Sequence, residues 1–148
     1  MSSSDLTQTE ADALQGIPKI RVDNTVYEYP GLGGSIRVPL KSHNGREDFI
    51  LDVSRGRIDL MKNNFQNRAR QITILARLDI GGAPHRNPDG TEVPCPHLHL
   101  YKEGFGDKWA EPLPVPFKDI NDPYDLLEKF MNFCNVVDKP NINKIIFS

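Results

Sequence analysis

Three of the four histidines lie close together in the chain, and their types and spacing could support acid–base chemistry on a phosphodiester. His97 and His99 are separated by one residue in the segment PHLHLYK, and His85 precedes them. On a β-strand such a pair projects from one face with about 6 to 7 Å between the side chains, a gap that suits a phosphate group. Imidazoles have pKa values of about 6.5, so they can take and give a proton near neutral pH. We therefore predict that His97 and His99 are the acid and base of RNA cleavage, with His85 as a supporting group.

Cleavage of RNA by its 2′-hydroxyl also requires a cation beside the phosphate, because negative charge develops there in the transition state. Tyr101 falls on the histidine side of the same predicted strand, so it joins the catalytic candidates. An aromatic side chain after the strand could stack on a base. The enzyme requires this histidine face to be open in a cleft. The predicted substrate-binding residues are Arg77, Arg86, Lys102, Lys108 and Trp109, with Phe105 as a second aromatic candidate.

Two other interpretations of the histidine pair stay open. Histidines on a polar sheet face often only make hydrogen bonds, and that structural role needs no cofactor. Alternatively, His97, His99 and Glu103 form H-x-H-x-x-x-E, which resembles the first metal-binding motif of cupins, with Gly90 upstream. Imidazole and carboxylate ligands fit a divalent metal. A cupin needs a further histidine downstream, none follows His99, and His85 is the available replacement.

Composition restricts the class of protein. The chain has 148 residues, 38% hydrophobic and 26% charged, with a formal net charge of -2. These values are typical of one soluble domain and exclude a polycationic nucleic-acid binder. The first residues contain neither a basic region nor an apolar run, and two isolated cysteines do not form a disulfide framework. We therefore expect a cytoplasmic protein that does not enter a membrane.

Charge is unevenly distributed along the chain. Residues 55–77 contain six basic residues and one acid, whereas residues 103–128 contain seven acids and two lysines. This polarity could hold an RNA backbone, or it could reflect ion pairs between neighbouring elements. Within the basic segment, four amides predict a polar turn that could touch a ligand: Asn63, Asn64, Gln66 and Asn67.

The pattern of the chain predicts an α+β fold: an antiparallel β-sheet meander with a short N-terminal helix and a C-terminal helix packed on the sheet. Thr7 and Glu10 form a capping box for a helix over 8–15, and Asp122 caps a helix that begins at Pro123. Residues 1–5 are predicted to be a flexible tail before a single domain, 6–148. Predicted strands cover 35–40, 48–55, 57–62, 71–80 and the segment after Pro96, a long ordered loop covers 81–96, and 141–148 could add an edge strand.

The segment GGAPHRNPDGTEVPCPHLHLYKEGFGDKWAEPLP, with RGRIDL and LTQTEADAL, resembles a family of small uncharacterised bacterial and phage proteins. This resemblance implies a fold unit from about Leu6 to Phe147 and transfers no catalytic role. Separately, APH at 83–85 and PHLH at 96–99 resemble the TumE-like toxins of bacterial toxin–antitoxin systems. That similarity implies action on RNA or nucleotides and an antitoxin partner, although KEGFGDKW does not match.

We therefore predict a nucleic-acid-directed protein, a metal-independent endoribonuclease toxin that acts on RNA or a nucleotide. The alternative is a non-enzymatic, phage-type inhibitor of a host defence complex, an anti-CRISPR-like module that binds a host defence protein. A homodimer is a further candidate assembly. The third alternative is the divalent-metal site at His97, His99 and Glu103.

Overall fold

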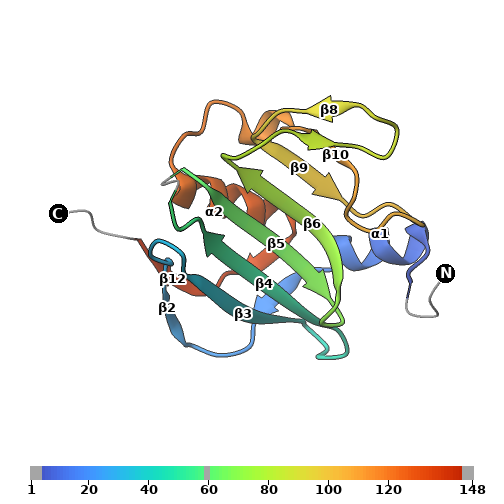
Figure 1. Ribbon diagram of the computed structural model, residues 1–148. Helices are drawn as coiled ribbons and strands as arrows, with labels where there is room; N and C mark the ends of the chain where they lie inside the picture. The colour runs from blue at the N-terminus through green and yellow to red at the C-terminus, as the bar shows by residue number, and fades with distance from the viewer. Residues whose placement is uncertain (1–4, 59–60, 145–148) are drawn as a thin grey trace.

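The computed structural model describes residues 5–58 and 61–144, and its architecture is α+β, as the sequence predicts. An eight-stranded sheet has the order β10-β9-β6-β5-β4-β3-β1-β11, and it is antiparallel except where β1 pairs with β11 (Figure 1). Its strands are β1 (Lys19–Arg21), β3 (Ser35–Ser42), β4 (Asp48–Arg55), β5 (Asn63–Ala69), β6 (Thr73–Ile80), β9 (His97–Leu100), β10 (Ala110–Pro112) and β11 (Val136–Asp138).

Shorter elements surround this sheet. Strands β2 (Val26–Glu28) and β12 (Asn141–Asn143) form a parallel pair, and β7 (His85–Arg86) and β8 (Glu92–Val93) form a small antiparallel hairpin. That hairpin lies within the segment 81–96, for which the sequence predicts only a loop. A short 3-10 helix, η1, covers Val115–Phe117. Residues 1–4 of the predicted tail and the end of the predicted C-terminal strand lie outside the described residues.

Both helices pack against one face of the sheet, behind it in the view of Figure 1. Helix α1 (Gln8–Gly16) begins with the predicted capping box, because Thr7 and Glu10 bond each other's backbone N–H groups. Helix α2 (Pro123–Phe133) begins after Asp122 and buries the predicted apolar stripe against β5. The helices and the inner sheet face therefore enclose one core, with Phe65, Leu78 and Leu98 at its centre.

One predicted strand is wrong. The structure has no strand in the described part of residues 57–62, and the next strand is β5, where the sequence predicts a polar turn. Two of its amides point inward: Asn63 accepts a hydrogen bond from the Tyr29 hydroxyl at 2.6 Å, and the Asn67 amide donates to Gln15 at 3.1 Å. These bonds allow polar side chains to occupy core positions, which hides the strand alternation.

The strand predicted over 71–80 also differs at its start. A register shift opposite Asn67 and Arg68 brings Arg68 against Ile74 and Asn67 against Ala76. Leu75 is therefore an extra residue, as in a β-bulge, and it is buried together with Ala76. Ile72, which a continuous alternation would place in the core, is 67% exposed. Beyond the bulge, Leu78 and Ile80 face inward and Arg77 and Asp79 face outward, as predicted.

A buried lysine joins the ends of both helices. Lys19 is fully buried, and its ammonium donates to the carbonyls of Gln15, Ile17 and Cys134 at 2.8 to 3.0 Å. The first two carbonyls lie at the end of α1, and the third follows α2. Burial lowers the pKa of Lys19 from 10.5 to about 8. The lysine therefore satisfies carbonyls that the helices leave without partners.

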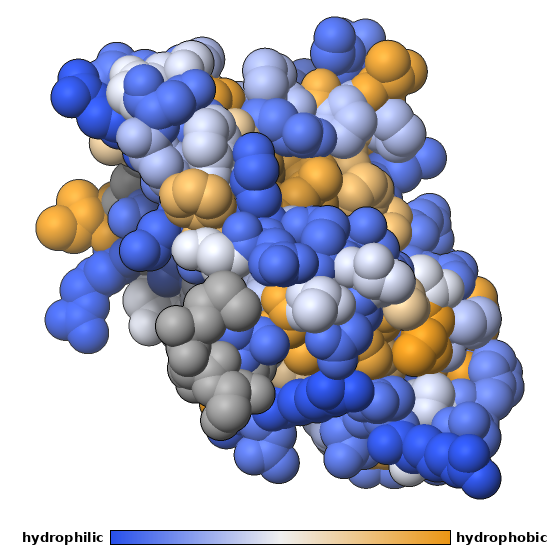
Figure 2. Space-filling view, turned by 90° about the vertical axis from the view of Figure 1, so that its right-hand side faces the viewer, coloured by the Kyte–Doolittle hydropathy of each residue, from blue (hydrophilic) through white to orange (hydrophobic). Residues whose placement is uncertain are grey.

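On the side of the molecule shown in Figure 2, most surface residues are hydrophilic, and apolar residues form smaller areas between them. Within the described residues, no helix is long and apolar enough to cross a membrane.

We predict that Lys19→Met lowers the free energy of unfolding by about 3 kcal/mol at pH 7, because three buried carbonyls lose their donor. Urea unfolding followed by circular dichroism measures this change. The folded chain releases the Lys19 proton at about pH 8 and the unfolded chain at 10.5. Wild-type stability should therefore rise relative to the variant between these values. A difference that does not change with pH would contradict the assignment.

Candidate functional site

The candidate site lies on the outer face of the sheet, which carries polar side chains across four strands. Strand register places Asn64 opposite Asp79, and Asp79 opposite His97. The next row contains Gln66, Arg77 and His99 in the same way. The eight residues of these rows, called here the polar track, are Ser54, Asn64, Asp79 and His97, then Asp52, Gln66, Arg77 and His99.

The two histidines meet Asp79 at the β9 end of the polar track. Asp79 Oδ2 lies 3.2 Å from His97 Nε2 and 3.1 Å from His99 Nε2. The ring of His85, from the β7–β8 hairpin, packs 4.6 Å from that of His99, centroid to centroid. The structure therefore brings together the three histidines that the sequence singles out and adds Asp79. These four residues are called here the histidine cluster.

The prediction that the histidine face is open in a cleft is wrong. His97 is 2% exposed and His99 is fully buried. Two segments explain the burial, the loop between β9 and β10 and the hairpin that carries His85. In that loop the Lys108 carbonyl bonds His85 Nε2 at 2.7 Å, and the Asp107 carbonyl bonds His99 Nδ1 at 2.8 Å. The segment after β9 and the hairpin that carries His85 thus cover the rings. Access from solvent remains through the edges of the cluster, since His85 is half-buried and the Asp79 side chain is 15% exposed.

Arg77 supplies the positive charge next to the cluster. Its guanidinium bonds Asp107 at 2.6 Å, Asp79 at 3.2 and 3.3 Å, and His99 Nε2 at 3.1 Å. Burial opposes ionisation of Asp79, but the hydrogen bond from His99 and the charge of Arg77 outweigh it and lower the pKa of Asp79 to about 2. Asp79 is therefore a carboxylate at neutral pH, ready to bind a cation.

Hydrogen bonding orients the ring of His99 toward that carboxylate. The Asp107 carbonyl can only accept, so the bond at His99 Nδ1 requires a proton on that nitrogen. When the ring is protonated, Nε2–H also donates to Asp79, and when it is neutral, the lone pair is on Nε2, which faces Asp79 and the Arg77 guanidinium. A histidine that donates to a backbone carbonyl and points its other nitrogen at an ion is typical of metal sites. His97 differs, because its Nδ1 is buried without a hydrogen-bond partner in the described part of the chain.

The geometry of three donor atoms suits a metal ion. One donor atom each from Asp79, His97 and His99 lie within 4.8 Å of one another. Ligands at about 2.1 Å from a tetrahedral ion are separated by about 3.4 Å, close to the two distances between Asp79 Oδ2 and the imidazoles. The two imidazole nitrogens lie within 4.8 Å of each other, so all three atoms can converge on a divalent transition metal.

The prediction that Glu103 is the third ligand beside His97 and His99 is wrong. Glu103 is exposed, and its side chain accepts a hydrogen bond from the backbone of Gln8 at 2.6 Å, so it is committed to the start of α1. The carboxylate beside the histidines comes from Asp79 instead, on the neighbouring strand. Spacing along one segment does not reveal this ligand. The signal that could have found it is the outward position of Asp79 on a strand that pairs with the histidine strand.

Tyr101 does not join the histidines. Its hydroxyl donates to the Leu6 carbonyl at 2.6 Å and accepts from the Leu6 N–H at 3.0 Å, and its ring packs on the core. Strand β9 ends at Leu100, so the alternation does not extend to Tyr101. Tyr101 therefore anchors the chain before α1, and the structure gives it a structural role.

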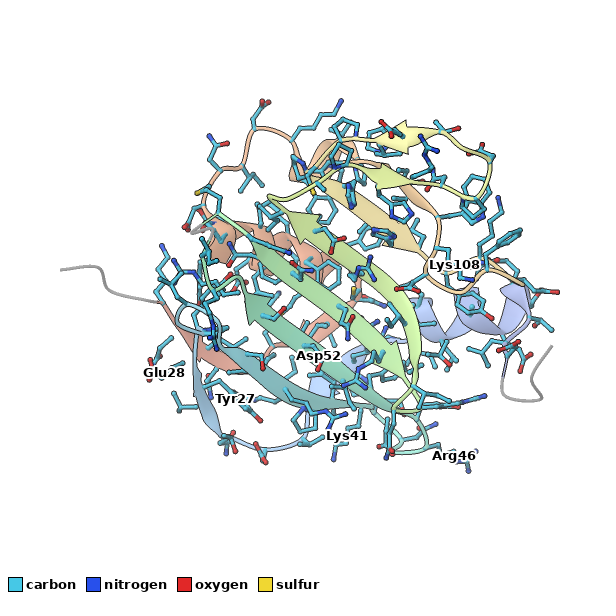
Figure 3. The ribbon with its side chains drawn as sticks, viewed as in Figure 1. Tyr27, Glu28, Lys41, Arg46, Asp52 and Lys108 are labelled. Atoms are coloured by element: carbon cyan, nitrogen blue, oxygen red, sulfur yellow. The ribbon has the colours of Figure 1, made fainter. Side chains whose placement is uncertain are left out.

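The predicted substrate-binding residues separate into three places. Arg77 lies at the cluster, whereas the exposed Arg86 pairs with Glu92 at 3.4 Å across the hairpin. Lys102 lies 4.1 Å from the centre of the Trp109 ring, which packs nearly perpendicular to the ring of Phe105. Lys108 is exposed in the loop between β9 and β10, and only its carbonyl contacts the cluster (Figure 3). Thus Arg77 alone among the five predicted residues has a charged group at the cluster.

The uneven charge of the sequence is partly neutralised inside the fold. Arg77 of the basic segment pairs with Asp107 of the acidic segment. Arg68 pairs with Asp52 at 2.6 Å, and Arg70 pairs with Glu47 at 3.0 Å. These pairs favour the structural explanation of the charge pattern that the sequence left open.

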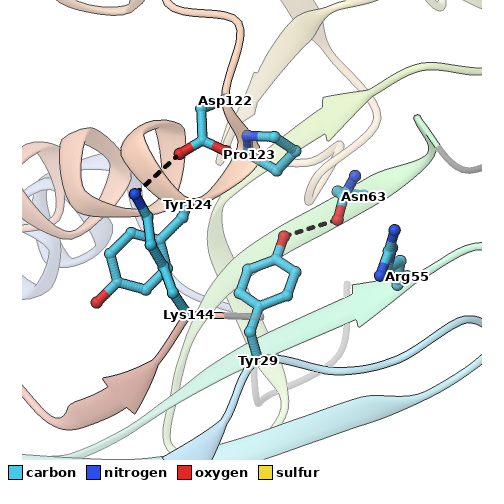
Figure 4. A pocket seen from close by; sticks show the side chains of 7 residues that line it. All are labelled: Tyr29, Arg55, Asn63, Asp122, Pro123, Tyr124 and Lys144. Carbon is cyan, nitrogen blue, oxygen red and sulfur yellow. Dashed lines mark hydrogen bonds and ion pairs between the residues drawn. The ribbon is translucent and has the colours of Figure 1, made fainter. Parts of the chain in front are cut away.

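A separate hollow lies beyond the polar track. It has a volume of about 230 Å³ and lies beside the start of α2, where Tyr29 bonds Asn63 at its base (Figure 4). Lys144 and Asp122 form an ion pair of 3.8 Å at its rim. The hollow contains none of the histidines.

Comparison with known proteins gives one match. A family of unknown function, DUF6978, matches residues 6–136. The chain belongs to DUF6978. The match to this family includes all four residues of the histidine cluster as well as α1 and α2, so the candidate site and the fold around it lie within the DUF6978 unit. No curated protein and no solved structure matched the chain.

We predict that Tyr101→Phe lowers the free energy of unfolding by about 1 to 2 kcal/mol, because the Leu6 carbonyl and N–H lose their partner. Thermal and urea unfolding measure the loss. Since the hydroxyl lies away from the cluster, any ligand binding or activity at the histidines should be unchanged in the folded variant. Loss of activity at full stability would restore the catalytic role that the sequence predicts.

Proposed function

We propose that the protein binds a divalent transition-metal ion through Asp79, His97 and His99. The observation that carries this proposal is the convergence of one carboxylate and two imidazole nitrogens within 4.8 Å. A mixed set of imidazole and carboxylate ligands suits ions such as Zn²⁺, Fe²⁺ and Mn²⁺.

The charge of the cluster supports the proposal. With neutral imidazoles, the carboxylates of Asp79 and Asp107 outnumber the guanidinium of Arg77 by one. In a neutral His99 ring the Nε2 lone pair lies 3.1 Å from the Asp79 carboxylate and repels it, and Arg77 Nη2, 3.1 Å from that nitrogen, offsets only part of this repulsion. A divalent ion removes both the excess negative charge and the repulsion.

The number of ligands indicates what the centre does. Three protein ligands leave at least one position for water or a substrate, as in catalytic metal sites. A Zn²⁺ ion held here would lower the pKa of a coordinated water to about 7 and so supply a nucleophile for hydrolysis. His85 is half-buried and its ring packs 4.6 Å from that of His99, so it could exchange a proton with a group held at the cluster. The proposed activity is therefore metal-dependent hydrolysis at the histidine cluster.

We predict that the metal-stripped protein takes up one equivalent of Zn²⁺, measured by isothermal titration calorimetry and elemental analysis. Asp79→Asn and His97→Ala should lower Zn²⁺ affinity by about 100-fold or more, because each removes a ligand. Two matched controls should bind normally: Glu103→Gln, which tests the carboxylate predicted from spacing, and His43→Ala, which removes an exposed histidine in the β3–β4 turn.

A second measurement covers variants that fold poorly. At a free Zn²⁺ concentration 100 times the dissociation constant, the wild type should gain about 2.7 kcal/mol of stability. Wild-type protein that takes up no Zn²⁺, or a Glu103→Gln variant as impaired as Asp79→Asn, would contradict the proposal.

The RNA-directed nuclease predicted from the sequence is a second candidate, and the position of His85 supports it. Unlike His97 and His99, His85 is half-buried, and its ring contacts both of theirs. It could therefore meet a phosphate from the solvent side of the cluster. The resemblance to TumE-like toxins points to the same substrate and to an antitoxin partner.

Cleavage of a labelled RNA distinguishes the two candidates. The metal-independent nuclease should keep its activity in EDTA and lose at least about 100-fold in His85→Ala, since general acid–base groups contribute that much. Activity that disappears in EDTA and returns with Zn²⁺ would instead support the metal centre. An unchanged rate in His85→Ala would eliminate His85 as acid or base.

A further inference from the structure

The part of the polar track next to the cluster forms a groove. Its lining residues come from β4, β5 and β6, and the hollow between them has a volume of about 330 Å³. Asp52 marks its far end on the outer sheet face (Figure 3). Strands are about 4.8 Å apart, so the track spans about 14 Å from β4 to the histidines on β9. The lining residues, called here the sheet groove, are Asp52, Ser54, Asn64, Gln66 and Arg77.

Most of the groove is polar and uncharged. Ser54 and Asn64 make no side-chain hydrogen bond to another described residue, and both are only half-buried. Gln66 donates to Asp52, and Asp52 also receives two hydrogen bonds from Arg68 at 2.6 and 3.0 Å. The charge of Asp52 is therefore neutralised. Hydroxyl and amide groups remain available for the hydrogen bonds of a polar ligand.

Arg77 connects the groove to the cluster. Its Nη2 atom lies 3.3 Å from Asp79 Oδ2 and 3.1 Å from His99 Nε2, the same two atoms that the proposed ion would bind. Two positive groups cannot share these atoms without strong repulsion. Metal binding therefore releases Nη2, while the bond from Nη1 to Asp107 at 2.6 Å keeps the guanidinium at the groove.

With the metal ion bound, the site favours binding of an anion. The ion and Arg77 together exceed the carboxylates of Asp79 and Asp107 by one positive charge. The Nη2 group released from Asp79 Oδ2 and His99 Nε2 offers its N–H donors to an oxyanion such as a phosphate. Such a group between Arg77 and the ion would complete the metal coordination and return the site to neutrality.

We propose that the sheet groove binds a phosphate ester, with its phosphate between Arg77 and the metal ion and its hydroxyl-rich part against Ser54 and Asn64. This inference rests on the proposed metal centre and names the class of ligand that the centre acts on. The phosphate ester can be a small sugar phosphate or a phosphodiester in a nucleic acid, and the two sources share the same contacts.

Isothermal titration calorimetry on Zn²⁺-loaded protein tests the groove, with ribose 5-phosphate, uridylyl-(3′→5′)-uridine and ribose as probes. Metal content is measured first for every sample. At least one of the two phosphate esters should bind about tenfold or more tightly than ribose, and the tighter one identifies the source. Asn64→Leu and Ser54→Val should each weaken that ester about tenfold at unchanged Zn²⁺ content. Arg46→Gln, which changes an exposed arginine in the β3–β4 turn away from the groove, is the matched control and should bind normally.

Arg77→Gln gives a readout that a structural role would not produce. Zn²⁺ affinity should rise, because the competing guanidinium is gone, while the preference for the phosphate ester over ribose should disappear. If the wild type takes up Zn²⁺ normally but prefers neither ester over ribose, the proposal of ester binding in the sheet groove is wrong, whereas the proposed metal centre is supported. Failure of the wild type to take up Zn²⁺ would overturn both. Unchanged ester binding in both Asn64→Leu and Ser54→Val would also contradict the assigned groove.

Discussion

The outer face of the sheet depends on one partly buried carboxylate. Asp79 lies where two histidines, an arginine and the mouth of the groove meet, and it remains ionised because Arg77 and His99 compensate for its burial. Charged groups in such surroundings need partners on every side. The antiparallel register of β5, β6 and β9 provides those partners by placing polar residues opposite each other in two rows. The loop carbonyls of Asp107 and Lys108 then fix the rings from outside.

The opposite face shows how the scaffold holds these rows rigid. Apolar residues alternate with those of the polar track, and both helices cover them. Lys19, on the strand next to β3, joins the ends of α1 and α2, and Tyr101 joins the start of α1 to the end of the histidine strand. The site thus rests on the central strands of the sheet, whose backbones are bonded on both sides. Side chains on such strands keep their separation, as a metal centre requires.

Local patterns in the sequence predicted the parts of the fold that depend on neighbouring residues. The capping box of α1, the apolar stripe of α2 and the outward pair His97 and His99 all follow from short spacings. Predictions from the sequence were wrong where contacts between distant parts of the chain determine the structure. Amide bonds to Tyr29 and Gln15 allow β5 to bury Asn63 and Asn67, and a bulge moves Ile72 to the surface. No local spacing shows that two loops cover the histidines or that Asp79, on another strand, replaces Glu103 beside them.

The most direct test of this account is an anomalous-diffraction map from crystals of the protein grown with Zn²⁺, with data collected on both sides of the zinc absorption edge. The account predicts a single strong peak about 2.0 to 2.2 Å from Asp79 Oδ2 and from the Nε2 atoms of His97 and His99, with Arg77 turned toward the groove. A map without a peak at these three atoms, while Arg77 still bonds His99 and Asp79, would contradict it. The cluster would then be a hydrogen-bonded support of the fold.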